Sequence, residues 1–459
     1  MSRAVVVEEW RAALNAHDAA RLRFLARQAR PADVAEVIGL LDADEGNTVL
    51  RALPRNAAAV SLSLLPESTR TDLLDILSDQ LLTDLIAHLP PDDAVDLLYE
   101  LPPDQARALL RNTLHEQSEK LRELMDYGED TAGGLMTNVL IALPETATVA
   151  AAVDEIRRVD LTDDEFFNVY VIDRRGRLVG LVPIASLLTR PADTPLGQIM
   201  STDIVTVGAE EDQEAVVHLC RKHDLSVVPV VGPDGAILGR ITTDDILDAA
   251  DEEAEEDLYR MAGTDPAELE TTSPLRAARI RGIWLVPCVA GCLFVAGVLF
   301  FFEAHIRDEH RILVLAFIPL IAAMGGNTGI QTSTGVVRAL AIGGRPESRI
   351  AGAFTREFPI AALLAVGLAF LCAGATALIG LNVGGGVWQI GYMVGISMWV
   401  AVTVSTSLGI ALPFLFQRLG VDPAIASGPI ITTSNDLISI TIYLSVCVLL
   451  LPAPSPLGS

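Results

Sequence analysis

Apolar residues dominate the second half of the chain, where they form five long stretches. These cover residues 282–302, 312–336, 354–380, 387–416 and 425–451. Each is long enough for an α-helix to cross the hydrocarbon core of a bilayer, which takes about 20 residues. The pattern predicts a membrane domain of five spanning helices, which we place at residues 281–452.

A different pattern fills the first part of the chain, where a leucine recurs every twelve positions. The series is Leu41, Leu53, Leu65, Leu77, Leu89 and Leu101, and four of the last five are followed by proline. Proline interrupts helices because it lacks an N–H and clashes with the preceding turn. Short helices that stack in pairs, each pair about 24 residues long, are typical of helical repeat proteins. We therefore predict an all-α superhelical domain over residues 1–130.

A second repeat follows, of a different kind. Leu135-Met136-Thr137 is echoed by Ile199-Met200-Ser201, and residues 171–180 are echoed by residues 230–239. Each copy has the apolar runs and glycine-containing turn of a β-α-β-β-α unit. The pattern resembles a tandem pair of cystathionine-β-synthase (CBS) modules, which fold together as one regulatory α/β unit. We place the two modules at residues 131–192 and 193–251.

Residues 244–257 are densely acidic and are predicted to be helical. A solvated, charged helix is the ordinary explanation for such a run. Here the run lies between the CBS-like pair and the membrane domain, so a change in its charge balance could be transmitted to both. We assign residues 252–280 to an acidic connecting helix and a linker.

Charge is distributed very unevenly along the chain. The formal net charge is −26, and all but seven of the 59 acidic residues precede residue 275, whereas ten of the 33 basic residues follow it. An acidic soluble part is thus joined to an apolar, slightly basic membrane part. This acidity argues against nucleic acid as a partner and favours cations, with a solvated acidic surface as the alternative.

The distribution of arginine predicts the orientation in the membrane. The N-terminus lacks an apolar core of signal-peptide length, so nothing indicates export of the acidic part. Eight arginines fall on one side of the five spans and two on the other, Arg307 and Arg311. The positive-inside rule then predicts the cytoplasmic membrane, with the N-terminal domains in the cytosol and the C-terminus outside.

Asp436 lies in the middle of the fifth apolar stretch. A carboxylate at the centre of a span costs about 2.5–3.5 kcal/mol on insertion scales, so such residues usually face water, an ion or a partner. We therefore predict that Asp436 binds a cation. The alternative is a structural carboxylate that accepts hydrogen bonds from the side chains of Thr432, Thr433, Ser434 and Asn435.

The second apolar stretch contains an unusual polar segment, residues 324–334 with the sequence MGGNTGIQTST. Glycines and polar side chains at membrane depth must face protein or water. Glycine-mediated helix packing is the alternative explanation. The segment and Asp436 are expected to converge on one site.

Two further groups of residues are candidates for ligand binding in the acidic part. Asp92 and Asp96 are one turn apart at the start of a helix, although acidic residues are common there. In CBS modules a Gly-x-x-Thr-x-x-Asp run often holds a nucleotide ribose. The second copy has this run as Gly239, Thr242 and Asp245, whereas the first has Gly180, Pro183 and Ser186. Adenine nucleotide, such as ATP, is therefore predicted only at Thr242 and Asp245.

Four segments of the sequence carry a resemblance to a known family: Gly325-Gly326-Asn327-Thr328-Gly329 with Gln331; Asp422-Pro423-Ala424 followed by Pro429, Thr433, Asp436 and Tyr443; Glu129-Asp130 with residues 132–137; and Asp212-Gln213-Glu214. Through these segments nearly the whole chain resembles the MgtE family of magnesium channels and transporters. Ala215 stands where the family commonly has a second glutamate.

The resemblance implies a multi-domain membrane protein: a homodimer with a helical superhelix, a CBS pair, a connecting plug helix and five transmembrane helices around a pore. It implies that Asp436, assisted by a polar break at Asn327, binds hydrated Mg2+ in the pore. It also implies regulatory Mg2+ sites that hold the pore closed when cytosolic Mg2+ is high. The matching regulatory positions are Asp92, Asp96, Asp212, Glu214, Asp224, Asp245, Asp248, Glu256, Asp257 and Asp422.

The leading hypothesis is therefore a Mg2+ channel or transporter for magnesium uptake and homeostasis, and not an enzyme. A transporter of Co2+, Mn2+ or Ni2+ is an alternative, because these ions also accept oxygen ligands. A membrane metal or nucleotide sensor that does not transport is another. A membrane metalloprotease would need a His-Glu-x-x-His motif on a span, and the sequence has none.

Overall fold

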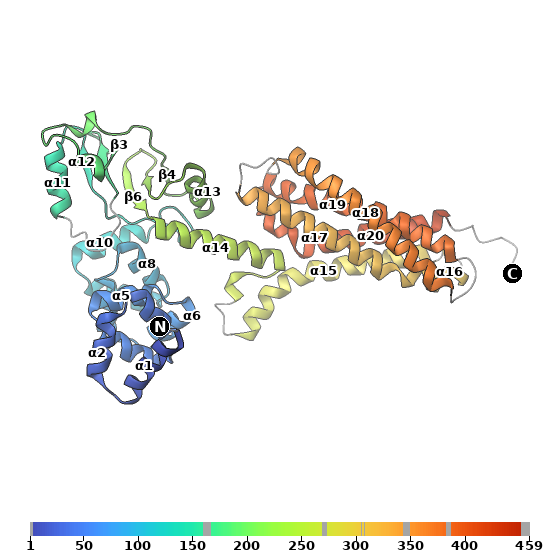
Figure 1. Ribbon diagram of the computed structural model, residues 1–459, viewed down its shortest axis with the longest axis horizontal. Coiled ribbons are helices and arrows are strands. Elements are labelled where there is room, and N and C mark those ends of the chain that lie inside the picture. The colour runs from blue at the N-terminus through green and yellow to red at the C-terminus, as the bar shows by residue number, and fades with distance from the viewer. Residues whose placement is uncertain are drawn as a thin grey trace. The chain divides into compact units, whose positions relative to one another are not determined.

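The computed structural model describes residues 3–158, 167–268, 273–303, 305–306, 308–342, 349–381 and 387–450. Its internal contacts divide the chain into two units, Met1–Asp251 and Glu252–Ser459. The first unit holds the helical domain and both CBS-like modules. The second holds the end of a long acidic helix and all the apolar helices (Figure 1).

The first unit begins with ten short helices. They are α1 (Arg3–Asn15), α2 (Ala19–Gln28), α3 (Pro31–Ile38), α4 (Ala43–Ala52), α5 (Arg55–Ser63), α6 (Glu67–Leu74), α7 (Asp79–Ile86), α8 (Pro91–Tyr99), α9 (Pro103–Asn112) and α10 (His115–Leu124). Contacts skip one helix at a time, α2 to α4 to α6 and α3 to α5 to α7 to α9. The helices therefore stack as two layers, which confirms the predicted superhelix.

The twelve-residue leucine repeat explains where these helices begin. Leu53 is extended, with φ −76° and ψ 155°, because a residue that precedes proline avoids the α region. Pro54 then occupies the N-cap of α5, where its missing N–H removes no helical hydrogen bond. The repeat leucines from Leu53 to Leu101 are at most 6% exposed, so the same residues that end the helices also fill the core.

Two three-stranded sheets follow, each with one parallel and one antiparallel strand pair. The first module consists of β1 (Ala142–Pro144), α11 (Val149–Arg158), β2 (Asn168–Ile172), β3 (Leu178–Pro183) and α12 (Ile184–Leu187). The second consists of β4 (Val207–Gly208), α13 (Gln213–His223), β5 (Val228–Val231), β6 (Ile237–Ile241) and the start of α14 (Thr243–Ala262). The predicted β-α-β-β-α order is confirmed in both.

The two modules exchange their leading segments. Thr137, ahead of β1, forms a reciprocal pair of 2.9 Å backbone hydrogen bonds with Arg240 of β6. Ser201, ahead of β4, pairs in the same way with Leu181 of β3. Each sheet is thus completed by backbone from the other module, so the pair folds as one body. Buried apolar residues also run without interruption from the superhelix into the second module.

The second unit is a bundle of long helices. It contains α15 (Pro274–Glu303), α16 (Asp308–Ala316), α17 (Ile318–Ile342), α18 (Ile350–Leu381), α19 (Val387–Arg418), the 3-10 helix η4 (Pro423–Ser427) and α20 (Pro429–Leu450). Among the described residues, five helices are long and apolar enough to cross a membrane: Pro274–Glu303, Val314–Ala341, Ile350–Thr376, Gly391–Arg418 and Pro429–Leu450. These spans match the five predicted stretches.

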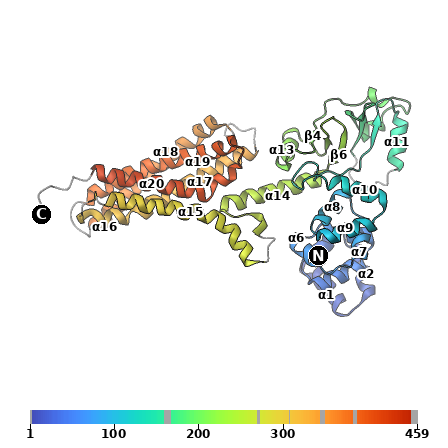
Figure 2. The ribbon, with the colours of Figure 1, turned by 180° about the vertical axis from the view of Figure 1, so that it is seen from behind.

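Helix α19 packs against α17, α18 and α20 in the bundle that Figure 2 shows from behind. Helix α20 in turn packs against α15 and α17, so the helix that carries Asp436 lies between them. Helix α15 has none of its most apolar 18-residue window buried within the chain. Its outer face is therefore available to lipid or to a second protein surface.

Candidate functional site

Asp436 lies in the middle of α20, against the glycine-rich segment of α17. A Cβ added at Gly326 would stand 3.4 Å from Asp436 Oδ1, so the carboxylate rests on bare backbone. No described residue donates a hydrogen bond to this carboxylate. Thr432 and Thr433 donate instead to the carbonyls of Gly428 and Pro429, one turn earlier in the chain. The alternative in which neighbouring hydroxyls cap Asp436 is therefore not what the structure shows.

Glycines 325 and 329 bring α17 and α20 into close contact. A side chain at Gly329 would overlap the amide of Asn435, and one at Gly325 would overlap the hydroxyl of Ser439. Asn435 and Ser439 are fully buried, and their polar side-chain atoms have no hydrogen-bond partner among the described residues. Both explanations of this segment therefore apply: its glycines allow close packing of α17 against α20, and the contact between the two helices is polar.

Helix α17 runs without interruption from Ile318 to Ile342, so the polar segment around Asn327 interrupts the apolar pattern of the span but not the helix. Glycine in a membrane helix does not by itself end the helix, because every backbone N–H can still reach the carbonyl four residues earlier. The side chain of Asn327 is exposed within the single chain. It lies one position after Gly326, the residue that contacts Asp436.

A second group of charges lies at the start of η4, just before α20. Asp422 accepts a 2.7 Å hydrogen bond from the Ala424 N–H and forms an ion pair with Arg260 near the end of α14. Arg260 also pairs with Glu256. The backbone of Met261 lies directly against Gly428, where any side chain would collide with its carbonyl. The end of α14 is therefore seated on the segment that leads into the Asp436 helix.

Asp257 belongs to the same group. Its pKa is raised by partial burial and by the charge of Asp422, while Arg260 and Arg338 oppose the rise. Glu256, Asp257 and Asp422, predicted as separate regulatory positions, are thus brought together by the fold. Arg260, which joins two of them, was not among the predicted site residues.

In the first unit, aspartates from the superhelix meet one from the second CBS module. Asp92 and Asp96 lie on α8, and Asp245 lies in the first turn of α14. Burial, followed by the charges of Asp245 and Asp93, raises the pKa of Asp92 well above its usual range. Burial also raises the pKa of Asp245 to about 7, with contributions from Asp244 and Asp93. Oδ1 of Asp92 is buried and has no hydrogen-bond partner among the described residues.

Asp96 borders the same group from one turn further along α8. Its side chain remains open to water, yet desolvation by the surrounding protein, followed by the charges of Asp93 and Asp245, raises its pKa to about 7. The Arg70 guanidinium opposes this rise. Carboxylates at such a junction repel one another unless a proton or a cation neutralises them.

The remaining predicted acidic residues are more scattered. Asp212 caps α13 and accepts a 2.9 Å hydrogen bond from the N–H of Glu214, whereas Asp224 ends the same helix in the left-handed conformation, φ 51°. All three side chains are exposed. Asp248 is exposed on α14, with a pKa raised by partial burial and by Asp244 and Asp251. The described residues contain no group of three or more Asp, Glu, His or Cys arranged to hold a metal ion.

Thr242 and Asp245, the predicted nucleotide contacts, are bonded to each other. The Thr242 hydroxyl lies 2.6 Å from Asp245 Oδ2 and also contacts Asp244, and the Thr242 N–H donates to Asp245 at 3.2 Å. Asp245 therefore takes part both in the start of α14 and in the acidic junction with α8.

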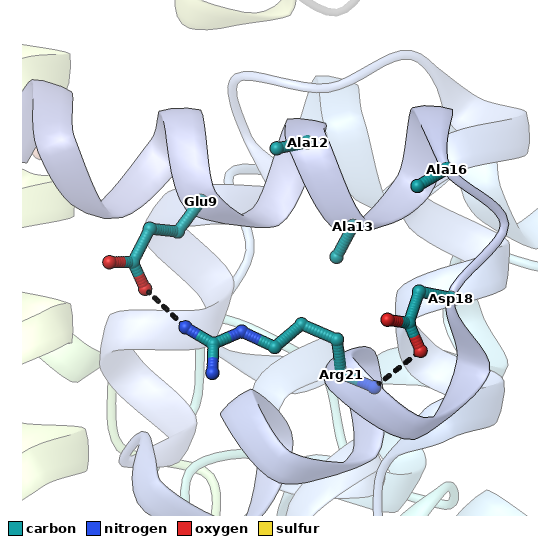
Figure 3. A pocket seen from close by; sticks show the side chains of 6 residues that line it. All are labelled: Glu9, Ala12, Ala13, Ala16, Asp18 and Arg21. Atoms are coloured by element: carbon teal, nitrogen blue, oxygen red, sulfur yellow. Dashed lines mark hydrogen bonds and ion pairs between the residues drawn. The ribbon is translucent and has the colours of Figure 1, made fainter.

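A cavity of about 250 Å3 lies between α1 and α2 and has few groups that could bind a ligand (Figure 3). Alanines form much of its lining. Its charged groups are engaged, since Arg21 reaches Glu9 at 3.4 Å and the Arg21 N–H donates to Asp18 at 2.9 Å. We assign no function to it.

Comparison with known proteins identifies the parts of the chain. The family model described as divalent cation transporter matches residues 318–446, and the MgtE intracellular N domain matches residues 29–130. The CBS domain matches residues 132–193 and 196–252. Magnesium transporter MgtE of Thermus thermophilus is 34% identical over 344 residues, which is 73% of either chain. The chain belongs to the MgtE family.

Other members of the family are comparably similar. Magnesium transporter MgtE of Enterococcus faecalis is 32% identical over 72% of this chain and 71% of its own. A crystal structure of the cytosolic domain of the Mg2+ channel MgtE in complex with ATP is 30% identical, with a TM-score of 0.51, and covers 53% of this chain and 99% of its own. The soluble part of a magnesium transporter, 25% identical, also has a TM-score of 0.51. The predicted family and architecture are confirmed.

We expect Gly329→Leu to separate α17 from α20 in this MgtE protein. The new side chain would occupy the space of the Asn435 amide, and overpacking of this kind costs about 1–3 kcal/mol or more. Thermal unfolding of the purified full-length protein measures the loss. Gly335→Leu on the same helix is the control, because no atom lies within 4 Å of its Cβ position. Equal midpoints for the two variants would contradict the proposed close packing.

We expect the metal-free first unit to lose stability as pH rises from about 4 to above 7. The folded state holds the pKa of Asp92 and Asp245 above the usual value. In that range the unfolded chain therefore binds fewer protons than the folded one, and stability falls with pH. Thermal unfolding in a chelator at pH 5 and pH 8 measures this fall. Asp245→Asn should flatten it, and Mg2+ at pH 8 should reverse it; an identical pH profile in the variant would refute the expectation.

Proposed function

We propose that the protein carries Mg2+ across the cytoplasmic membrane, with Asp436 as the ion-binding group of the pore. The observation that carries this proposal is a mid-span carboxylate that rests on glycine backbone and that no described side chain neutralises. Its relatives are named magnesium transporters.

A single carboxylate in each chain suits a largely hydrated ion. Mg2+ gives up its water reluctantly and is usually held by one or two carboxylates together with retained waters. A C2 homodimer would bring two Asp436 side chains to one axis and balance the charge of the ion. Exposed Asn327, one residue beyond the Asp436 contact, would then assist by binding the water shell. The uncovered face of α15 supports a dimer as well as contact with lipid.

We propose that the N-terminal domains lie in the cytosol and that the C-terminus lies outside. The arginine distribution favours this orientation, and five spans put the two ends on opposite sides. We also propose the following division: superhelix 1–130, CBS modules 131–192 and 193–251, acidic connecting helix and linker 252–280, and pore domain 281–452. The family matches to residues 29–130, 132–193 and 196–252 support it.

Regulation by cytosolic Mg2+ follows from the charges of the first unit. When Mg2+ is scarce, Asp92, Asp96 and Asp245 repel one another at the junction of α8 and α14, and this repulsion loosens the junction. When Mg2+ is abundant, the ion bridges them and tightens the first unit. We propose that the exposed residues Asp212, Glu214, Asp224 and Asp248 contribute weaker sites elsewhere on the first unit. A tight, metal-filled first unit corresponds to the closed transporter.

Glu256, Asp257 and Asp422 form the second regulatory site of this proposal. Arg260 already supplies a positive charge between Glu256 and Asp422. Mg2+ would compete with that guanidinium for the Asp422 carboxylate. Because Asp422 lies just ahead of α20, Mg2+ binding at Asp422 would affect the position of the helix that carries Asp436.

A second ligand is proposed for the CBS pair. The cytosolic domain of a related Mg2+ channel was crystallised with ATP. This chain presents Thr242 and Asp245 at the start of α14, where a ribose could replace the hydrogen bond between them. Mg2+ and nucleotide would then share Asp245, so ATP is expected to affect closure.

Asp436→Asn should abolish Mg2+ uptake. The substitution preserves shape but removes the charge that balances the ion. Uptake into liposomes that contain a Mg2+-sensitive dye measures the effect, and Asp193→Asn, an exposed change in the first unit, is the matched control. Normal flux through Asp436→Asn would refute the pore assignment. Flux of Mn2+ or Co2+ without Mg2+ would favour the alternative substrate.

Asp92→Asn combined with Asp245→Asn should leave uptake intact while closure requires more cytosolic Mg2+. The double change removes two of the charges that a bridging ion neutralises. Liposome flux measured over a series of Mg2+ concentrations on the cytosolic face tests this expectation. An unchanged closing concentration would count against the sensor assignment, whereas loss of flux at every concentration would indicate a folding defect.

A further inference from the structure

A small polar cavity of about 80 Å3 lies among α17, α18 and α19, away from Asp436. Three apolar residues of α18 form part of its lining. The other lining residues are polar: Thr328, Gln331, Thr332, Glu357 and Thr406. The cavity therefore joins a carboxylate of one membrane-spanning helix to hydroxyl and amide groups of two others.

Glu357 is the charged member of this group. It lies seven residues after the start of α18, about 10 Å along the helix, and its side chain is 18% exposed. Glu357 Oε1 forms a long ion pair, 3.8 Å, with Nε of the adjacent Arg356, a separation beyond hydrogen-bond distance. A carboxylate within a membrane span is energetically costly, so such residues usually face water, an ion or a partner. The proposed Mg2+ path does not use Glu357.

Thr406 is an independent sign of a missing ligand. Its side chain lines the cavity and is only 1% exposed, yet its hydroxyl has no hydrogen-bond partner among the described residues. A buried hydroxyl left without a partner costs about 1–3 kcal/mol, so such groups usually meet a water or an ion. Thr328 uses its proton on the Met324 carbonyl at 2.7 Å, which leaves its oxygen lone pairs for a cation.

The cavity and Asp436 lie on different sides of α17. Gly326 contacts Asp436, whereas Thr328 lines the cavity, and two residues are separated by about 200° around an α-helix. One helix thus separates the two carboxylates.

We propose that this cavity is a second cation site, which binds one partly dehydrated monovalent alkali cation. One carboxylate with neutral oxygens balances a single positive charge. The cavity is small, about 80 Å3, and its ligands are one carboxylate and neutral side-chain oxygens. Stripping Mg2+ of its water for a single carboxylate is unfavourable. The bound cation would fix the packing of α18 and α19 against α17.

Thermal unfolding of the purified full-length protein tests the site directly. The midpoint is measured in NaCl, in KCl and in N-methyl-D-glucamine chloride at equal ionic strength. A ligand that binds only the folded state raises the midpoint in a saturable way. We expect Na+ or K+ to raise it relative to the bulky organic cation. Glu357→Gln should lose this rise, Thr406→Val should weaken it, and Asp436→Asn should retain it.

Three results would overturn the proposal: equal midpoints in all three salts, an undiminished rise in Glu357→Gln, or a rise that only Mg2+ produces through Glu357. If Glu357→Gln does not fold in any salt, the milder Thr406→Val carries the test, and an unchanged rise in that variant counts against the site. The site does not depend on the proposed transport, because the readout contains no Mg2+ flux. If the assignment of Asp436 to the pore were refuted, the proposed monovalent cation site would still stand.

Discussion

The membrane unit depends on one constraint: a carboxylate inside a span must be kept away from hydrocarbon. Two bare glycines make this arrangement possible, because they let α20 approach α17 closely enough for Asn435 and Ser439 to be fully buried. Asp436, on the same helix, then lies over Gly326. The position of the charged residue is thus set by the absence of side chains on its neighbour. A larger residue at Gly325 or Gly329 would alter the proposed Mg2+ path as well as the stability of the membrane unit.

Much of this architecture can be predicted from short, local patterns in the sequence. The leucine–proline repeat predicts the superhelix because each pair both ends a helix and supplies its buried leucine, and the paired glycine turns predict the two modules. The apolar stretches predict the spans because length and hydropathy alone decide whether a helix can cross a bilayer. Asp436 could be found in the same way, since a charge among apolar residues is visible without any partner.

What the sequence could not supply are the partners across long separations. Arg260 and Asp422 are 162 residues apart, and nothing in either neighbourhood indicates that they form an ion pair. Asn435 looked like one of several hydrogen-bond donors near Asp436, yet the fold turns it toward Gly329 and buries it. Glu357 and Thr406 are 49 residues apart, and only the fold brings both side chains to one cavity. The polar segment around Asn327 leaves α17 intact, because a membrane span keeps its backbone hydrogen bonds even where glycine and asparagine lower helix propensity in water.

Arg260 would give the proposed Mg2+ site at Asp422 an unusual property. A guanidinium tethered within reach of Asp422 acts as an internal competitor at a fixed effective concentration, set by geometry and independent of the cell. At the proposed site, the Mg2+ concentration needed for occupancy would exceed the dissociation constant of the free carboxylates, because Mg2+ would first have to displace the guanidinium. The working range of such a sensor is therefore adjustable through the reach and charge of one side chain, without any change to the carboxylates that bind the ion.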